Sequence, residues 1–264
     1  MFDASSIWRH TLQRILYSGL EVSPRGKLTK ELLQHTLIVN MQAPVVTVAE
    51  RKLNYRFMAA EAHWILSGDD TVAGIAPYNK NIAQFSDDGE RFFGAYGPKI
   101  QSQLDYVVSK LREDQDTRQA GLTIWRENPP ATKDVPCTVA IFTSIRNHKL
   151  NLHVFMRSSD AWLGVPYDVF NFSMLGHLIC CRLNEGRASF DQSIEPDKLF
   201  LTAASSHLYE PNWEAATACA SAAISQQAST PVPLWTDEKV LYVWLENLRE
   251  SKPGDKLRWW ELPT

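Results

Sequence analysis

The sequence VPCTVAIFTSIRNHKLNLHVFMRSSDAWLGVPYDVFNF, residues 135–172, decides how the rest of the chain is interpreted. Two runs rich in β-branched and aromatic residues, 138–145 and 150–156, predict the strands of a hairpin about residues 146–149. The strongly apolar run 169–183 predicts a buried helix. Around these elements stand a lone cysteine after a proline, an arginine–serine pair and a carboxylate beside a Gly/Pro turn. Together they could handle the phosphate and the base of a nucleotide.

The flanking sequence predicts further helices and strands in mixed order. The expected helices cover residues 6–20, 49–67, 98–112, 169–183 and 212–227, with a last one beginning at Thr236, and the further strands cover 32–39, 122–125 and 199–203. In the last helix we expect Val240, Leu241, Trp244, Leu245 and Leu248 to face inward. Residues 69–97 are poorly periodic and predict a long functional loop with short helical turns. No repeat or linker divides the chain, so residues 1–264 are expected to form one α+β domain.

The composition is that of an ordinary globular protein, with 264 residues, 44% hydrophobic and 22% charged. The formal net charge of −3 excludes attraction to nucleic acid or a membrane by bulk charge, and we expect no direct DNA binding. An anionic ligand would therefore need a few well-placed arginines. No run of about 18 apolar residues predicts a membrane span, and Arg9, His10 and Arg14 interrupt any leader-like segment.

The four cysteines, Cys137, Cys180, Cys181 and Cys219, form no CxxC pair and no zinc spacing, so no metal site is expected. Cys180 and Cys181 lie in an apolar run, where a buried thiol is the usual outcome. Free thiols favour a reducing compartment, and we expect a cytoplasmic protein, in the host cytoplasm if a phage encodes it.

Cys137 is the first candidate for chemistry. A free cysteine is most often a buried structural residue, whereas a nucleophilic one needs nearby positive charge or a helix N-terminus to form its thiolate. Here Pro136 precedes the cysteine directly, and Arg157-Ser158-Ser159-Asp160 begins 20 residues after it. This surrounding pattern favours the nucleophile.

Pro136-Cys137 and the string 157–160 resemble the nucleophile segment and the following motif of the thymidylate synthase family, closest to its branch that hydroxymethylates deoxycytidylate in bacteriophages. Further segments match the family in the same order, namely Arg25 and residues 61–69, 94–97, 116–118 and 207–209. The resemblance therefore covers most of the chain.

The resemblance implies a fold, a reaction and a set of site residues. The fold would be a mixed β-sheet with helices packed on one face, assembled sheet to sheet as a homodimer. Cys137 would attack carbon 6 of the pyrimidine, Glu61 and Tyr96 would handle protons through ordered water, and 5,10-methylenetetrahydrofolate would donate the one-carbon unit. The implied substrate-binding residues are Arg25, Arg118, Arg157, Ser158, Ser159, Asp160, Asp168, His207 and Tyr209, with Arg118 crossing to the partner subunit. Folate would contact Glu61, Asp160 and Trp260.

Each of these residues also has a structural interpretation. Glu61 is compatible with a solvated helix position, and each arginine with an ordinary surface site. Asp160 is equally compatible with bracing a turn. His207 and Tyr209 are compatible with core positions whose polar tips are satisfied. Planar guanidinium groups are nevertheless what a phosphate dianion prefers.

Asp168 is the residue that points to cytosine. At the matching position thymidylate synthases carry asparagine, which offers one donor and one acceptor to uracil. An ionised aspartate only accepts, so it suits a cytosine protonated at nitrogen 3, which presents two donors. A uracil oxygen would face a carboxylate oxygen and be repelled. An asparagine could turn to pair with cytosine, so the rule is a preference; the resemblance implies dCMP as substrate.

The last step of the reaction has two possible acceptors. Water gives a hydroxymethyl product, whereas hydride from folate gives a methyl product, as in a dCMP methyltransferase or a thymidylate synthase. In the family, loop tryptophans shield the reaction from water, but the matching loop 69–89 has only Tyr78 and Phe85 as aromatics. We therefore expect hydroxymethylation, unless Trp259 and Trp260 supply the shield.

Two departures from the family pattern leave a further alternative. Gln119 stands where the family has a second arginine, and the C-terminal residues 261–264 lack the usual apolar ending. A catalytically silent relative that only binds a nucleotide or RNA therefore remains a competing interpretation.

Overall fold

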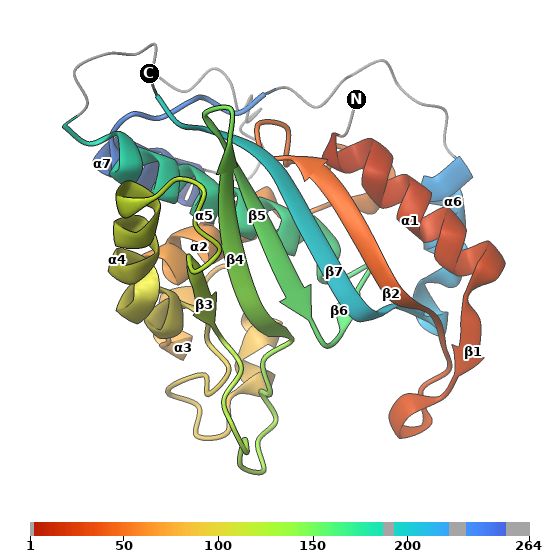
Figure 1. The fold of residues 1–264 in the computed structure, drawn as a ribbon. Helices are drawn as coiled ribbons and strands as arrows, with labels where there is room; N and C mark the ends of the chain where they lie inside the picture. Colours follow the sequence, from red (N-terminus) through yellow and green to blue (C-terminus); the bar gives the residue numbers. More distant parts are fainter. Residues whose placement is uncertain (1–2, 187–192, 222–230, 252–264) are drawn as a thin grey trace.

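The computed structural model describes residues 3–186, 193–221 and 231–251. Within these residues the centre of the molecule is a seven-stranded mixed sheet with the order β1-β2-β7-β5-β4-β3, while β6 pairs with β7 outside this path (Figure 1). The strands are β1 (Leu20–Val22), β2 (Thr29–Asn40), β3 (Gly121–Thr123), β4 (Thr138–Arg146), β5 (Lys149–Met156), β6 (Ser159–Asp160) and β7 (Glu195–Tyr209).

The strand pairings join distant parts of the chain. Strand β2 runs antiparallel to β7, from Thr29 opposite Tyr209 to Asn40 opposite Lys198. Strand β7 is parallel to β5 and to the short β6. The hairpin predicted from the opening stretch is confirmed, since β4 and β5 pair antiparallel across the turn between Arg146 and Lys149.

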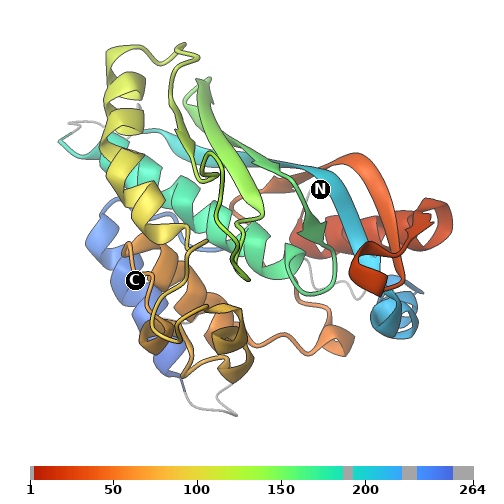
Figure 2. The same cartoon turned by 90° about the horizontal axis from the view of Figure 1, so that it is seen from below.

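The helices cover one face of the sheet, as Figure 2 shows, which confirms the expected α+β arrangement. They are α1 (Ala4–Ser18), α2 (Tyr55–Leu66), α3 (Val72–Ile75), α4 (Gly97–Glu113), α5 (Val165–Asn184), α6 (Trp213–Ser221) and α7 (Glu238–Glu250). Helix α5 lies between the sheet strands β5 and β7 and the outer helices α2 and α7. Its sequence is apolar on nearly all sides because it is buried on nearly all sides.

Some predicted boundaries were wrong for identifiable reasons. The helix expected from residue 49 begins at Tyr55, because the Asn54 side chain accepts the Phe57 amide hydrogen and caps it there. A separate 3₁₀ turn, Ala49–Arg51, precedes it. The strands expected at 32–39 and 199–203 extend to 29–40 and 195–209. Of the helix expected at 212–227, residues 222–227 lie outside the described chain.

The last helix also corrects one inward position. Leu241, Trp244, Leu245 and Leu248 are buried as expected, but Val240 is 47% exposed. Val240 lies one residue before Leu241, so it falls about 100° away around the helix and off the buried stripe.

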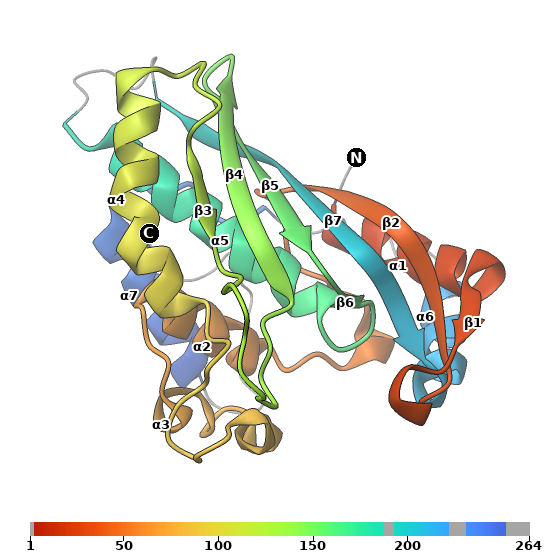
Figure 3. The same ribbon diagram turned by 60° about the horizontal axis from the view of Figure 1, so that its bottom comes forward.

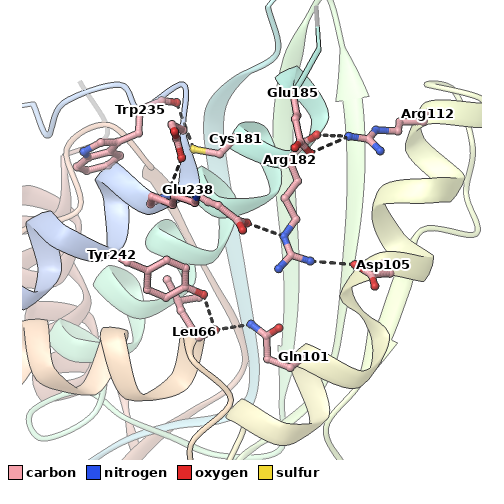
Figure 4. A network of polar contacts seen from close by, with 12 residues as sticks. Leu66, Gln101, Asp105, Arg112, Cys181, Arg182, Glu185, Trp235, Glu238 and Tyr242 are labelled. Atoms are coloured by element: carbon pink, nitrogen blue, oxygen red, sulfur yellow. Dashed lines mark hydrogen bonds and ion pairs between the residues drawn. The ribbon is translucent and has the colours of Figure 1, made fainter.

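Ion pairs and polar contacts tie the outer helices to the end of α5 (Figure 4). The Arg182 guanidinium on α5 contacts Asp105 of α4 at 2.9 Å and Glu238 of α7 at 2.8 Å. Tyr242 of α7 donates a hydrogen bond of 2.7 Å to the carbonyl oxygen of Leu66, at the end of α2. These contacts fix the helical layer around α5.

The sheet face away from the helices exposes large apolar side chains. Phe142 and Phe155 lie edge to face on β4 and β5 and are 43% and 44% exposed. Beside them His153 stacks on Phe200 with ring centroids 4.9 Å apart. On this face of the sheet, aromatic side chains therefore lie uncovered by the described helices.

Candidate active site

Several predicted residues meet where β5, β6 and β7 end and β2 and β4 begin (Figure 3). A cavity of about 540 Å³ opens there. Five of the predicted substrate-binding residues line it: Arg25, Arg157, Ser158, His207 and Tyr209. They come from segments as far apart in sequence as residues 25 and 209, and the sheet register brings them together.

The turn before β2 places Arg25 at the cavity. Arg25 has φ of 54°, in the left-handed region, within the 3₁₀ turn Pro24–Gly26. On the opposite strand, His207 and Tyr209 form an edge-to-face pair with ring centroids 5.1 Å apart. Lys27 lies 5.9 Å from the centre of the Tyr209 ring. The turn thus brings the cations Arg25 and Lys27 to this side of the cavity, which the carboxylate of Glu31 also lines.

Arg157 links the cavity to Cys137. Its guanidinium donates hydrogen bonds to the carbonyl oxygens of Pro136 (3.0 Å) and Val135 (2.8 Å). Its own backbone N–H donates to the carbonyl oxygen of Cys137 at 2.8 Å. Arg157 thus holds the segment that presents the thiol.

The Cys137 thiol is partly buried just before β4. Burial raises its pKa, and the Arg157 charge opposes that rise, while Asp168, Asp134 and Asp160 add to it. The thiol therefore rests in its protonated form near neutral pH, and the nearby guanidinium is the group that favours the thiolate.

Strand β6 pairs Ser159 with Ser206 of β7, and Ser158 directly precedes this strand. Ser158 Oγ lies 3.4 Å from Nδ1 of His207. Ser159 is 3% exposed, and within the described residues its Oγ has no hydrogen-bond partner. Ser158 faces the cavity, whereas Ser159 belongs to the buried side of the strand.

Tyr96 lies within electrostatic range of both Cys137 and Asp168. Its hydroxyl oxygen accepts a hydrogen bond of 3.3 Å from the backbone N–H of Thr138, and its ring stacks on Phe172. Burial raises the pKa of Tyr96, and the charges of Asp168 and Cys137 raise it further. Tyr96 therefore stays a neutral donor next to the nucleophile segment.

Asp168 lies in the first turn of α5, where Gly164 leaves room for it. A Cβ atom on Gly164 would lie 3.1 Å from Oδ2 of Asp168. Burial raises the pKa of Asp168 to about 8, with smaller contributions from the charges of Glu61 and Asp160. Asp168 is thus mainly protonated at neutral pH, unlike the ionised carboxylate expected from the sequence.

Glu61 lies on α2, and its charge acts on Asp168 of α5. Nδ2 of Asn171, on α5, donates to Oε2 of Glu61 at 2.7 Å. Burial raises the pKa of Glu61 to about 7, and the Asn171 hydrogen bond opposes that rise. A carboxyl group with a pKa near neutrality can both take and return a proton.

The remaining predicted residues have different surroundings. Oδ1 of Asp160 accepts the backbone N–H groups of Trp162 (2.8 Å) and Leu163 (2.9 Å), so this carboxylate braces the turn into α5. Arg118 is exposed on the turn between α4 and β3 and does not line this cavity. Trp260 lies outside the described residues, as does Trp259.

The loop 69–89, expected to shield the reaction less well than its counterpart in the family, contains the short helices α3 and Lys80–Phe85. Phe85 is 49% exposed. The Tyr78 hydroxyl donates to Glu250 of α7, so this ring is held against α7.

Sequence reasoning missed Lys133 and Asn171. Lys133 lines the cavity and adds a cation to those of Arg25 and Arg157. Its only signal was a basic residue shortly before Pro136-Cys137. For Asn171 the signal was an amide within the apolar run Val169–Phe172, where an unpaired polar group would be costly.

A second hollow of about 550 Å³ lies between α4, α5 and α7, but its arginines, Arg112 and Arg182, are already bound to carboxylates or carbonyls. The described residues hold no group of three or more His, Cys, Asp or Glu side chains suited to a metal. None of the described helices is both long and apolar enough to span a membrane. The cavity that Arg25, Lys133 and Arg157 line is the better candidate for a substrate, although Cys137, Glu61, Tyr96 and Asp168 are not among its lining residues.

Comparisons with known proteins agree with this geometry. A family model described as thymidylate synthase matches residues 6–237. The chain is also similar to a protein of Bacillus phage SP01 described as deoxyuridylate hydroxymethyltransferase, with 33% identity over 184 residues. That match covers 61% of this chain and 47% of the phage protein, so the chain spans about half of that relative's length.

Proposed function

Because this chain belongs to the thymidylate synthase family, we propose that it transfers a one-carbon unit from 5,10-methylenetetrahydrofolate to carbon 5 of dCMP, and that water completes the reaction. The product would be 5-hydroxymethyl-dCMP. The observation that carries this proposal is Asp168, a buried carboxyl group with a raised pKa, in the same electrostatic cluster as Cys137.

The phosphate of the nucleotide would bind to the cationic side of the cavity. Arg25, Lys133 and Arg157 line it and supply donors for a dianion. Lys133 offers a replacement for the charge that the family has where this chain has Gln119. The sugar hydroxyl would then reach His207 and Tyr209 at the end of β7.

Asp168 would hold the edge of the base. A protonated carboxyl group has one donor, which suits nitrogen 3 of a neutral cytosine, and one acceptor, which suits the 4-amino group. The Cys137 thiol first gives up its proton to solvent, and the thiolate beside Arg157 then bonds to carbon 6. Negative charge builds on the ring, and the proton passes from Asp168 to nitrogen 3. This contact is stronger in the transition state than in the ground state, so it lowers the activation free energy.

Glu61 and Tyr96 would handle the other protons. Glu61 has a pKa near neutrality and is suited to take the carbon 5 proton through water and to activate the water that ends the reaction. Folate supplies the one-carbon unit when bound. Asp160 retains one carboxylate oxygen beyond its turn contacts for a donor on that ligand.

Hydration rather than hydride transfer is supported by two observations. The loop that shields the reaction in the family has no tryptophan here, and Phe85 within it is 49% exposed. The phage relative is described as a hydroxymethyltransferase. A methyl product, from a dCMP methyltransferase or a thymidylate synthase, is the alternative to be tested.

A second candidate substrate is dUMP. The phage relative is described as acting on deoxyuridylate. A protonated Asp168 can also accept from nitrogen 3 of uracil and donate to its 4-oxygen. Discrimination for cytosine then lies in proton transfer to nitrogen 3, so it should affect kcat more than nucleotide affinity.

We also propose a homodimer formed by the aromatic sheet face. Arg118 lies three residues before Gly121, which pairs with Phe142, so along β4 it is near the level of Ile145. This is about 25 Å from Cys137 at 3.3 Å per residue, too far to serve the cavity of its own chain. Arg118 can contribute to a phosphate site only across such an interface.

The test is mass spectrometry of the product formed from dCMP or dUMP with methylenetetrahydrofolate, together with tritium release from the 5-labelled nucleotides. We expect a hydroxymethyl group on dCMP, little tritium from dUMP and no dihydrofolate. Cys137→Ala should abolish tritium release, and Asp168→Asn should shift the preference toward dUMP.

Other outcomes decide between the alternatives. Dihydrofolate formed in step with turnover would favour the methyl product. Faster turnover of dUMP than of dCMP by the wild type would show that dUMP, and not dCMP, is the substrate. Tight dCMP binding without tritium exchange would identify a catalytically silent relative.

A further inference from the structure

Asn171 is a buried amide at the centre of the apolar helix α5. It lies one turn after Asp168 and is 4% exposed. Residues three apart on a helix share a face, so Asp168 and Asn171 both face Glu61 of α2. The 2.7 Å hydrogen bond from Nδ2 to Oε2 of Glu61 is the contact that this amide makes.

The other half of the same amide is unused. Within the described residues no donor reaches Oδ1 of Asn171, although the atom is fully buried. Buried acceptors are nearly always satisfied, so an orphan next to a titrating carboxyl group calls for an explanation.

The explanation lies in the two forms of Glu61. The ionised carboxylate accepts only and needs the NH₂ group of Asn171. The protonated acid has an O–H to donate, and the amide oxygen can accept it after a half-turn about the last side-chain bond. The two ends of an amide have nearly the same shape, so this exchange needs no repacking.

The charged groups around Glu61 do not supply a hydrogen bond that holds its carboxyl group. Asp168 and Tyr167 of α5 interact with its charge, but neither is hydrogen-bonded to it. On the α7 side of α2, Arg249 is bound to His63 at 3.0 Å. The neutral amide is the group that contacts the carboxyl.

Resting on the proposed function, we propose that Asn171 is a positioning residue that holds the Glu61 carboxyl group in place in both its ionised and its protonated form by exchanging amide donor for amide acceptor. Glu61 can then take a proton and return it without changing its orientation toward the substrate.

The first test needs no turnover. Glutamate labelled with ¹³C at the carboxyl carbon reports the titration of Glu61, whose signal is assigned by its loss in Glu61→Gln. Asn171→Leu should raise the midpoint by about one pH unit, because the ionised form loses its donor. The control Asn184→Leu removes an amide from the same helix, where it pairs with both backbone groups of Ile194, and should leave the midpoint unchanged.

Structures at about two pH units below and above that midpoint test the exchange itself. The Asn171–Glu61 contact should be present at both. Contact on the alkaline side only, or an unshifted midpoint in Asn171→Leu, would overturn the inference. Both readings hold even if dCMP proves to be the wrong substrate.

Kinetics add a readout that depends on the proposed function. Asn171→Leu should lower kcat by about a hundredfold, the usual cost of a misplaced group. KM for the nucleotide should change by less than about threefold, since Asn171 is not among the residues that line the proposed phosphate cavity. Asn184→Leu with the same loss of kcat would assign the effect to folding instead.

Discussion

Asp168 shows how burial alone changes what a carboxyl group can do. On the surface an aspartate is ionised and can only accept hydrogen bonds at neutral pH. At the first turn of α5 its pKa is about 8, mainly because burial penalises the charged form. It therefore keeps the proton that the cytosine ring needs.

The same raised pKa predicts a pH-dependent stability. The folded state holds this proton more tightly than the unfolded state, so its contribution is complete below about pH 4 and is lost as the pH rises through about 8. Wild type should lose about 4 kcal/mol more unfolding free energy than Asp168→Asn between pH 5 and pH 9, about three pH units at about 1.4 kcal/mol each. Urea unfolding at both pH values measures this.

The exposed Asp116 provides the matched control for that measurement. Asp116→Asn should keep the pH dependence of the wild type. Equal slopes for wild type and Asp168→Asn would mean that Asp168 ionises normally in the folded protein.

At the scale of elements, the start of α5 positions the base-handling carboxyl group. The turn from β6 into α5 is braced by Asp160, and Gly164 lets the chain pass close to Asp168. Pro166 lies in the first turn, where its missing N–H costs nothing. A short sequence thus builds a rigid helix entry beside the nucleophile.

Gly164→Ala tests this arrangement. The new Cβ would lie 3.1 Å from Oδ2 of Asp168 and 3.1 Å from the carbonyl oxygen of Asp160, so both must move by a few tenths of an ångström. We expect a loss of about 1 kcal/mol in unfolding free energy and a fall of about tenfold in kcat with dCMP. Unchanged kcat together with the stability loss would show that Asp168 does not depend on this close approach.

The sequence predicted the elements whose periodicity is strong and missed features set by tertiary contacts. The β4–β5 hairpin and α5 follow directly from their apolar patterns. The full length of β7 could not be predicted, because Ser205 and Ser206 interrupt the pattern and become strand residues through pairing with β2 and, for Ser206, also with β6. The start of α2 depended on one capping side chain, Asn54.

The sequence likewise predicted the residues of the candidate site that belong to motifs and missed those that do not. Arg25, Arg157, Ser158, His207 and Tyr209 follow from ordered motifs, and the structure places them on one cavity. Lys133 and Asn171 belong to no motif, and only packing shows that one lines the cavity and the other contacts Glu61. The protonation state of Asp168 depends on burial, which spacing does not reveal.

At the scale of the whole molecule, the proposed dimer makes each site depend on two chains. Arg118→Ala and Cys137→Ala should each be inactive as homodimers. When the two are mixed and allowed to exchange subunits, half the dimers gain one intact site, so activity should recover to about a quarter of wild type. Activity assays after mixing measure this.

The subunit-exchange experiment has a control mixture and an outcome that would contradict the proposed role of Arg118. In a mixture of Cys137→Ala and Asp168→Asn, each chain has a defect in its own site. No mixed dimer then contains an intact site, so activity with dCMP should not rise above that of the separate variants. A monomer in sedimentation experiments, or no recovery with Arg118→Ala, would remove Arg118 from the partner's site.

The pairing of β2 with β7 also affects how the chain is made. About 150 residues separate the end of β2 from the start of β7, so a ribosome adding 5–20 residues per second leaves β2 without its partner for roughly 8–30 seconds. During that time a twelve-residue strand with apolar side chains is open to other nascent chains. Recombinant yield should therefore depend on chaperone supply and growth temperature more than on the stability of the finished protein.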